Sequence, residues 1–151
     1  MKKTFIPVVL TLLYLNGSAQ TLEQTMEKRA SEFHRVIGLN DKEQWKKFIQ
    51  ESYTKALIEK PMKARTVKQG EEGNSSETKD IKGTIEDKVN MFQRLHNDFG
   101  GSKIISIKPN GENLEMELSA GDLTGVFKFK FDKNTPYLID GLGVQVEGGG
   151  R

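Results

Sequence analysis

The chain has no cysteine, a single tryptophan and little excess of either charge, since its 151 residues carry a formal net charge of +2. The absence of cysteine excludes disulfide bonds, thiolate zinc sites and cysteine nucleophiles. The length is too short for most large catalytic folds, including a complete serine hydrolase or a barrel enzyme. One domain is therefore expected, and the composition by itself names no reaction.

Only one long apolar run is present, and it lies near the N-terminus. There, Lys2-Lys3 precede an apolar stretch over residues 5–15 that is too short for a stable membrane anchor, and small residues follow at 17–19. This pattern is typical of a secretory signal peptide over residues 1–19. We predict cleavage after Ala19 and export to the periplasm or the medium.

Removal of this segment would leave 21 basic and 21 acidic residues, so the mature chain would be neutral. A neutral domain lacks the positive charge with which nucleic-acid binders hold phosphates. It also lacks the polybasic cluster that draws proteins to acidic membranes. We therefore expect neither nucleic acid nor a membrane span or surface among its partners.

The front half of the mature chain predicts helices. Apolar residues at helical spacing from Leu22 to Ile37 define one amphipathic helix, and Gly38 ends it. Asn40 offers an N-cap for a second helix, with Glu43 completing a capping box. A short third helix covers residues 55–59. The second helix and its end place four residues on the inner face: Trp45, Phe48, Ile49 and Tyr53.

Residues 62–83 contain few large apolar groups, and such a segment buries too little surface to offset its ordering entropy. We predict a mobile insertion there, with a short strand near residues 65–68. A helix follows, capped by Thr84 and Asp87, and Gly100-Gly101 are expected to end it through a positive φ. Its inner face would carry Ile85, Val89, Phe92, Leu95 and Phe99.

From residue 103 onward the apolar pattern alternates, which predicts an antiparallel meander of four strands. The Asn110-Gly111 pair is a two-residue hairpin signal that sets Ile107 opposite Leu114. A last strand is expected over residues 137–146, with a bulge or bend at Asp140-Gly141.

The middle pairing of the meander follows from two alternating strands. Aligning Leu118 with Phe127 sets Met116 opposite Phe129, and it sets Glu117 opposite Lys128 on the other face. One face of the sheet is then apolar and the other charged. The sequence thus predicts an α+β domain over residues 20–147, in which N-terminal helices pack on a four-stranded antiparallel meander, followed by a flexible tail over 148–151.

Two groups of residues resemble a known family. The first runs from Asn40-Asp41 through Trp45 to Leu57, and the second is the stretch from Arg94 to Gly101. Together they resemble the small accessory domain found with exported bacterial β-lactamase-like serine hydrolases and tail-specific peptidases. That domain is similar to the cone-shaped, cystatin-like fold of the nuclear transport factor superfamily.

The resemblance implies a cone-like fold with a curved sheet around a helix, and often a pocket between the two. Residues 66–82 depart from the family as an insertion. No hydrolase domain follows in this chain, so a catalytic partner would be a separate chain. The resemblance assigns no catalytic residue to this domain.

Two Ser-x-x-Lys matches begin at Ser52 and Ser76, but the partner motifs of penicillin-binding enzymes are absent, and so are nucleophile-elbow and phosphate-loop motifs. The two histidines, His34 and His96, have no metal-ligand spacing, and we expect neither a metal nor a cofactor. His96 is expected to be a hydrogen-bonded boundary residue. Its alternative role is a weak acid/base pair with Asp140.

Five residues would line a pocket between helix and sheet if one exists: Trp45, Phe92, His96, Phe129 and Asp140. Aromatic stripes at these spacings are more often plain core. We predict a non-enzymatic, exported accessory domain that binds a protein, such as an exported hydrolase, or a small apolar ligand. One alternative is a small hydrolase or isomerase that uses His96 and Asp140, and another is a degenerate accessory domain without independent activity.

Overall fold

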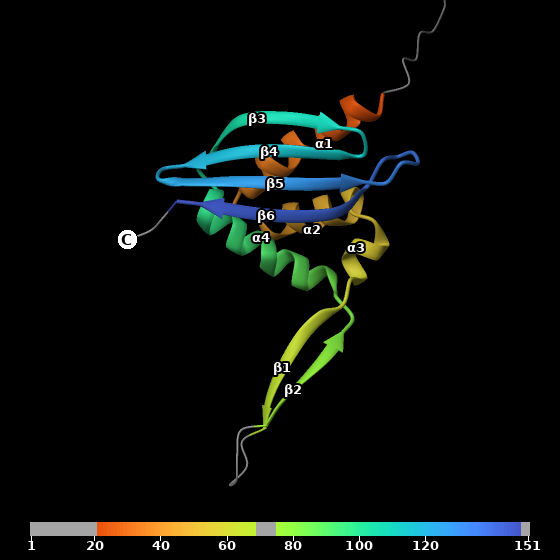
Figure 1. The fold of residues 1–151 in the computed structure, drawn as a ribbon, viewed down its shortest axis with the longest axis vertical. Coiled ribbons are helices and arrows are strands. Elements are labelled where there is room, and N and C mark those ends of the chain that lie inside the picture. The colour runs from red at the N-terminus through yellow and green to blue at the C-terminus, as the bar shows by residue number, and fades with distance from the viewer. Residues whose placement is uncertain (1–20, 69–74, 149–151) are drawn as a thin grey trace, which may run out of the picture.

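The computed structural model describes residues 21–68 and 75–148, which form two layers and a projecting hairpin (Figure 1). The predicted signal peptide, residues 1–19, lies outside the described residues. In chain order the elements are α1 (Leu22–Ile37), α2 (Lys42–Ser52), α3 (Lys55–Glu59), β1 (Met62–Lys68), β2 (Ser75–Ile81), α4 (Ile85–Phe99), β3 (Lys103–Asn110), β4 (Asn113–Ala120), β5 (Leu123–Phe131) and β6 (Ile139–Glu147).

The strands β3, β4, β5 and β6 form one antiparallel sheet in chain order, and the helices lie on one of its faces (Figure 1). This confirms the α+β class, with helices first and a four-stranded meander after them. Within the described ranges, no helix has the length and apolar character needed to cross a membrane.

The core lies between the helices and the sheet, and the faces predicted from helical and alternating spacing are confirmed. Buried apolar side chains come from α1, α2, α4, β4 and β5, while Ile85 and Leu22 are only partly buried. The charged residues Glu115, Lys128 and Lys130 are exposed on the other face of the sheet. Burial of the aromatic and aliphatic side chains supplies most of the driving force for this arrangement.

The α2 helix begins one residue later than the sequence suggested. Asp41, not Asn40, is the N-cap, and its Oδ1 accepts hydrogen bonds from the backbone N–H groups of Glu43 and Gln44 at 3.0 and 3.1 Å. The predicted Asn40–Glu43 capping box is therefore wrong. A carboxylate also interacts more favourably than an amide with the positive end of the helix dipole.

The α4 helix has the predicted capping box, in which Thr84 and Asp87 bond each other's backbone N–H groups. Its C-cap residue, Gly100, does not have the positive φ that we expected, since φ is −59°. Glycine is required there for space. A Cβ atom at position 100 would lie 2.7 Å from Nδ1 of His96, whose ring folds back over the helix end.

The segment between α3 and α4 contains two paired strands, where the sequence predicted one short strand within an insertion. β1 and β2 pair antiparallel from Met62 opposite Ile81 to Lys68 opposite Ser75. Residues 69–74, which join them, lie outside the described residues. At the base of the hairpin, Gly83 packs closely on the end of α3, because its Cβ would lie 2.7 Å from the carbonyl oxygen of Ile58.

The predicted register of the sheet is wrong by two residues at the β3–β4 and β4–β5 hairpins. Ile107 pairs with Met116 rather than Leu114, and Met116 pairs with Phe127 rather than Phe129. Both turns place a glycine with positive φ first, Gly111 at 61° and Gly121 at 60°. A two-residue shift leaves the paired side chains of β4 and β5 on their predicted faces, because strand side chains alternate with a period of two. Ile105, which was expected on the apolar face opposite Met116, instead lies in the bulge of β3 and is exposed.

The bulge predicted near Asp140 is confirmed, since the pairing of β5 with β6 shifts between Lys130 and Phe131. The strand itself begins at Ile139 rather than at residue 137. Tyr137 adopts a φ of 53° in the preceding turn, which is incompatible with a strand.

Candidate functional site

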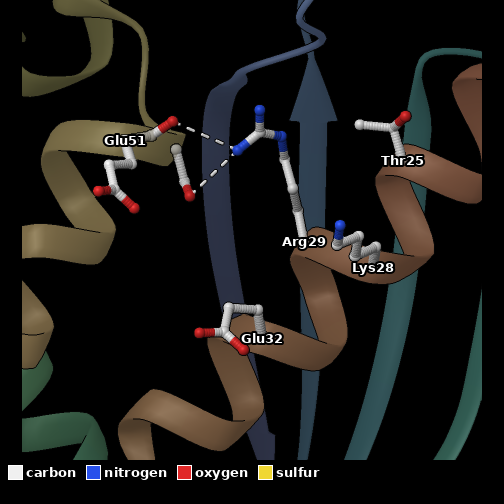
Figure 2. A pocket seen from close by; sticks show the side chains of 6 residues that line it. Thr25, Lys28, Arg29, Glu32 and Glu51 are labelled. Atoms are coloured by element: carbon white, nitrogen blue, oxygen red, sulfur yellow. Dashed lines mark hydrogen bonds between the residues drawn. The ribbon is translucent and has the colours of Figure 1, made fainter. Parts of the chain in front are cut away.

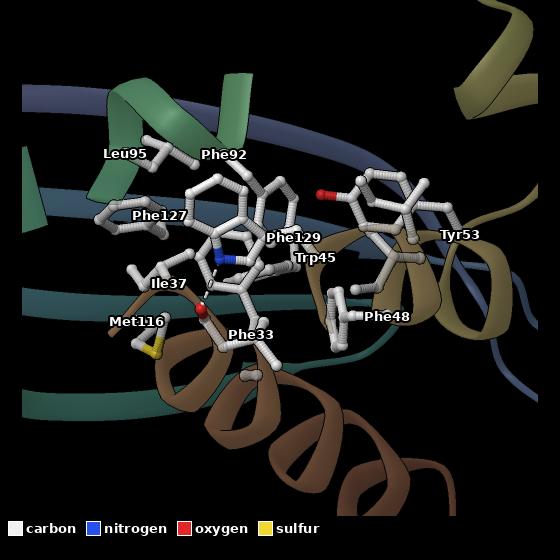
Figure 3. Close-up of a cluster of buried hydrophobic side chains, with 14 of the residues drawn as sticks. Phe33, Ile37, Trp45, Phe48, Tyr53, Phe92, Leu95, Met116, Phe127 and Phe129 are labelled. Atoms are coloured by element: carbon white, nitrogen blue, oxygen red, sulfur yellow. Dashed lines mark hydrogen bonds between the residues drawn. The ribbon is translucent and has the colours of Figure 1, made fainter. Parts of the chain in front are cut away.

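The space between helices and sheet is filled by side chains, including three of the predicted pocket residues (Figure 3). Trp45, Phe92 and Phe129 have no more than 1% of their surface exposed. The Phe33 ring lies 5.4 Å from Phe92 and 5.2 Å from Phe129, centroid to centroid, and both contacts are edge-to-face. The Trp45 Nε1–H donates to the Val36 carbonyl at 2.7 Å. These side chains are the core of the domain.

His96 takes part in joining the ends of two helices. Its Nδ1 donates to the carbonyl of Ile37, the last residue of α1, at 2.8 Å, and its ring centroid lies 5.8 Å from that of Trp45. The other histidine, His34, bonds the carbonyl of Ser102 through Nε2 at 3.1 Å. Both histidines thus satisfy backbone carbonyls near helix ends, as expected for boundary residues.

Asp140 lies at the opposite end of the sheet, at the beginning of β6. Its Oδ1 accepts a hydrogen bond from the Thr54 hydroxyl at 2.8 Å, and Thr54 is the N-cap of α3. His96 and Asp140 are therefore engaged by different elements, and their hydrogen bonds do not bring them together as an acid/base pair.

A polar hollow of about 320 Å³ lies beside Arg29 of α1, lined also by Thr25, Lys28, Glu32, Glu51 and Ser52 (Figure 2). The Arg29 guanidinium donates to the Glu51 carbonyl at 3.3 Å, the Ser52 hydroxyl at 3.1 Å and the Pro136 carbonyl at 3.0 Å. Burial lowers the pKa of Arg29. This arginine joins α1 to the end of α2 and to the β5–β6 loop.

Two of the polar side chains that line the hollow are engaged in hydrogen bonds or ion pairs. Ser52, the first residue of a Ser-x-x-Lys match, is held by Arg29, and the carboxylate of Glu32 pairs with Arg35 at 2.7 Å. The side-chain hydrogen bond from Arg35 holds the pKa of Glu32 below its usual range. Across residues 21–68 and 75–148, no cluster of three or more His, Asp or Glu side chains is arranged to hold a metal ion.

The edge of the sheet along β6 carries two of the exposed apolar side chains of the described surface. Tyr53 and Thr54 pair with Ile139, where the Thr54 N–H donates to the Ile139 carbonyl at 2.9 Å. Beyond Ile139, no backbone group of the described residues pairs with this side of β6. Val144 and Val146 remain 37% and 53% exposed.

The opposite edge, β3, has features that oppose strand pairing. Lys103, Lys108 and Pro109 lie along it, and the register shift between Ile104 and Ser106 leaves a bulge. Lysine, proline and bulges are the devices by which proteins block edge-to-edge pairing. The stretch of β6 from Gly141 to Val146 has no charged residue, proline or bulge. The two edges therefore differ in their capacity to accept another strand.

A shallow groove of about 410 Å³ lies next to this edge, on the face of the sheet away from the helices. Its β6 portion contains Gly141 and Gly143, which pair with Lys130 and Lys128 of β5. A Cβ atom at Gly143 would have no neighbour within 4 Å. The lysine side chains thus border a strip of β6 that carries no side chains on this face.

Comparisons of the chain with family models, curated proteins and solved structures find no match.

Part of this site could be recognised from the sequence alone. The Gly141-Leu142-Gly143 run and the uncharged stretch after it signal an unprotected strand, but only the pairing order places β6 at the edge. Arg29 has no local signal, because its partners Ser52 and Pro136 are 23 and 107 residues away in the chain.

Proposed function

We propose that this chain is a non-enzymatic protein-interaction domain that binds a partner by strand addition at the β6 edge. The observation that carries the proposal is the stretch Gly141–Glu147, whose side away from β5 has no strand partner among the described residues, with its two exposed valines. An edge strand offers a row of free N–H and C=O groups, and an incoming extended segment is held by main-chain hydrogen bonds.

The filled interior argues for a surface function. A small apolar ligand would need a cavity under the sheet, and Trp45, Phe92 and Phe129 occupy that space with edge-to-face and tilted ring contacts. Interiors packed to this degree admit a ligand only at the cost of displacing side chains. The acid/base alternative is also unfavoured, because His96 and Asp140 are bonded to different elements.

Export and association with a hydrolase or peptidase are part of the proposal. The basic and apolar pattern of residues 1–19 supports export, and the resemblance of residues 94–101 to the accessory domain of exported hydrolases supports that class of partner. The order of helices followed by a meander is compatible with the cone-like fold of that domain.

A site-specific photo-crosslinking experiment tests the proposal. A benzophenone amino acid is placed at Val146 on the open edge, or at Ile105 on the protected edge, in the full chain expressed in its own host. The two positions are matched, with 53% and 56% of their surface exposed. We expect a discrete protein adduct from position 146 and none from position 105.

The partner identified in that adduct is then added to the purified chain. Strand addition predicts slower amide hydrogen exchange over residues 141–147, with residues 103–110 unchanged. The substitution Val144→Lys should abolish both the adduct and the protection, because an inward-pointing charge blocks edge pairing. Equal adducts at 146 and 105, or a substrate turnover that disappears in His96→Ala, would contradict the proposal.

A further inference from the structure

We infer that the segment accepted by β6 is an extended stretch in which apolar and acidic side chains alternate. This inference rests on the proposed function, and it adds the chemistry of the partner. It follows from the different character of the two faces that β6 offers to an added strand.

The face on the helix side of β6 is apolar. Val144 pairs across the sheet with Phe127, and Val146 pairs with Gly125, so both valines lie on the core side of the sheet. Their exposure shows that the helices leave this margin of the face uncovered. An added strand would place every second side chain beside these valines, and apolar residues there would bury surface that water now covers.

The opposite face of β6 is open and bordered by positive charge. Gly141 and Gly143 lack side chains there, and Lys130 and Lys128 stand beside them on β5. Gln145 and Glu147 follow on the same face, opposite Val126 and Thr124, so the positive border belongs to the Gly141–Gly143 part of β6. Strands are spaced about 4.8 Å apart, so an added strand lies about 10 Å from β5. At that distance the Lys128 and Lys130 side chains can extend over Gly143 and Gly141 and contact acidic side chains of the added strand.

The lysines are available for this contact. Lys128 is 3.7 Å from Glu115, and both side chains are about half exposed, which makes this a weak pair. Lys130 has no carboxylate within 4.0 Å in the described part of the chain. Glu115 is the one acidic side chain that lines the groove, beside Lys128 and Lys130.

Two synthetic peptides test the chemistry directly. One is a seven-residue peptide of alternating valine and glutamate, and the other replaces each glutamate with lysine. Binding to the full mature chain is measured by fluorescence anisotropy at low and high salt. We expect the acidic peptide to bind, to weaken with salt, and to protect the amides of residues 141–147 from exchange, whereas the basic peptide does not bind.

Charge-reversed variants give the matched control. Lys128→Glu with Lys130→Glu should weaken binding of the acidic peptide by roughly tenfold, because the loss of each partly exposed charge pair costs roughly threefold in affinity. Lys46→Glu with Lys47→Glu, on the exposed side of α2, changes net charge equally and should leave binding within about twofold.

The outcomes separate the two proposals. Equal binding of both peptides, with protection of residues 141–147, would overturn the inference and leave strand addition standing. Absence of protection by either peptide, together with no crosslink at position 146, would overturn both. A dimer in light scattering that Val146→Lys dissolves would also overturn the inference, because the added strand would then be β6 of a second copy.

Discussion

The ring of Phe99 at the end of α4 lies against the backbone of Gly125 in β5, where a Cβ atom would come within 2.6 Å of Phe99 Cζ. Gly125 is also the residue that pairs with Leu118 in the observed register. The predicted register instead placed Phe127 opposite Leu118. Only a residue without a side chain lets the helix end approach the sheet this closely, so this contact favours the observed pairing.

Substitution of Gly125 by alanine should therefore destabilise the fold by about 1–3 kcal/mol, the usual cost of overpacking a core. The measurement is the free energy of unfolding in urea. Gly143→Ala is the matched control, since no atom lies within 4 Å of its Cβ, and it should change stability by no more than about 0.5 kcal/mol. Equal effects of the two substitutions would show that Phe99 does not pack on Gly125.

Replacing Arg29 with alanine should lower the free energy of unfolding by about 1–2 kcal/mol, because the buried Ser52 hydroxyl and the more exposed carbonyls of Glu51 and Pro136 lose their charged donor. Arg29→Lys should recover little of this loss, since one ammonium cannot match the guanidinium fork. Arg35→Ala, which removes only an exposed pair with Glu32, should cost no more than about 1 kcal/mol. Chemical denaturation of the three variants distinguishes a structural arginine from a surface one.

The Tyr53 hydroxyl is buried and has no hydrogen-bond partner among the described residues. Burial raises the pKa of Tyr53. Tyr53→Phe should therefore be neutral or stabilise the protein by about 1 kcal/mol, because it removes an unsatisfied polar group. Thermal unfolding tests this, and a clear loss of stability would reveal a partner for the hydroxyl. Trp45→Phe provides the contrast, since it breaks the bond to Val36 and should destabilise.

The capping box of α4 predicts an acid-sensitive contribution to stability. Hydrogen bonds from the Thr84 side chain and backbone hold the pKa of Asp87 below its ordinary value of 3.8. A carboxyl whose folded pKa is lowered stabilises the fold above the unfolded pKa and loses that effect as the pH falls through the folded pKa. Asp87→Asn should accordingly narrow the stability difference between pH 6 and pH 2.5 in urea titrations. Glu86→Gln, one residue earlier, is the control, and an equal change there would contradict a specific role for Asp87.

Local sequence determined the helices and the faces of the strands. Apolar spacing marked the buried side of α1, α2 and α4, and alternation marked the inner residues of β4 and β5, because burial of one face is the dominant free-energy term in both cases. The bulge at Asp140 could also be predicted, because a glycine follows directly and interrupts the alternation of apolar residues.

Details that depend on a second element were not predictable from local pattern. The N-cap shifted from Asn40 to Asp41, and Gly100 proved to be a steric requirement of His96 rather than a positive-φ position. Asn40 and Asp41 are both favourable N-cap residues, and a glycine after a helix can adopt either sign of φ.

The sequence by itself determined which faces of α1, α2, α4, β4 and β5 are buried, because the separation of apolar from polar residues is a local property with a fixed period. Only the tertiary structure decided the register of the sheet, the position of β6 at its open edge and the separation of His96 from Asp140. These depend on contacts between residues far apart in the chain, such as Phe99 with Gly125 and Arg29 with Pro136. A two-residue slip preserves the apolar face, so the pattern alone leaves the register open, and close packing selects one.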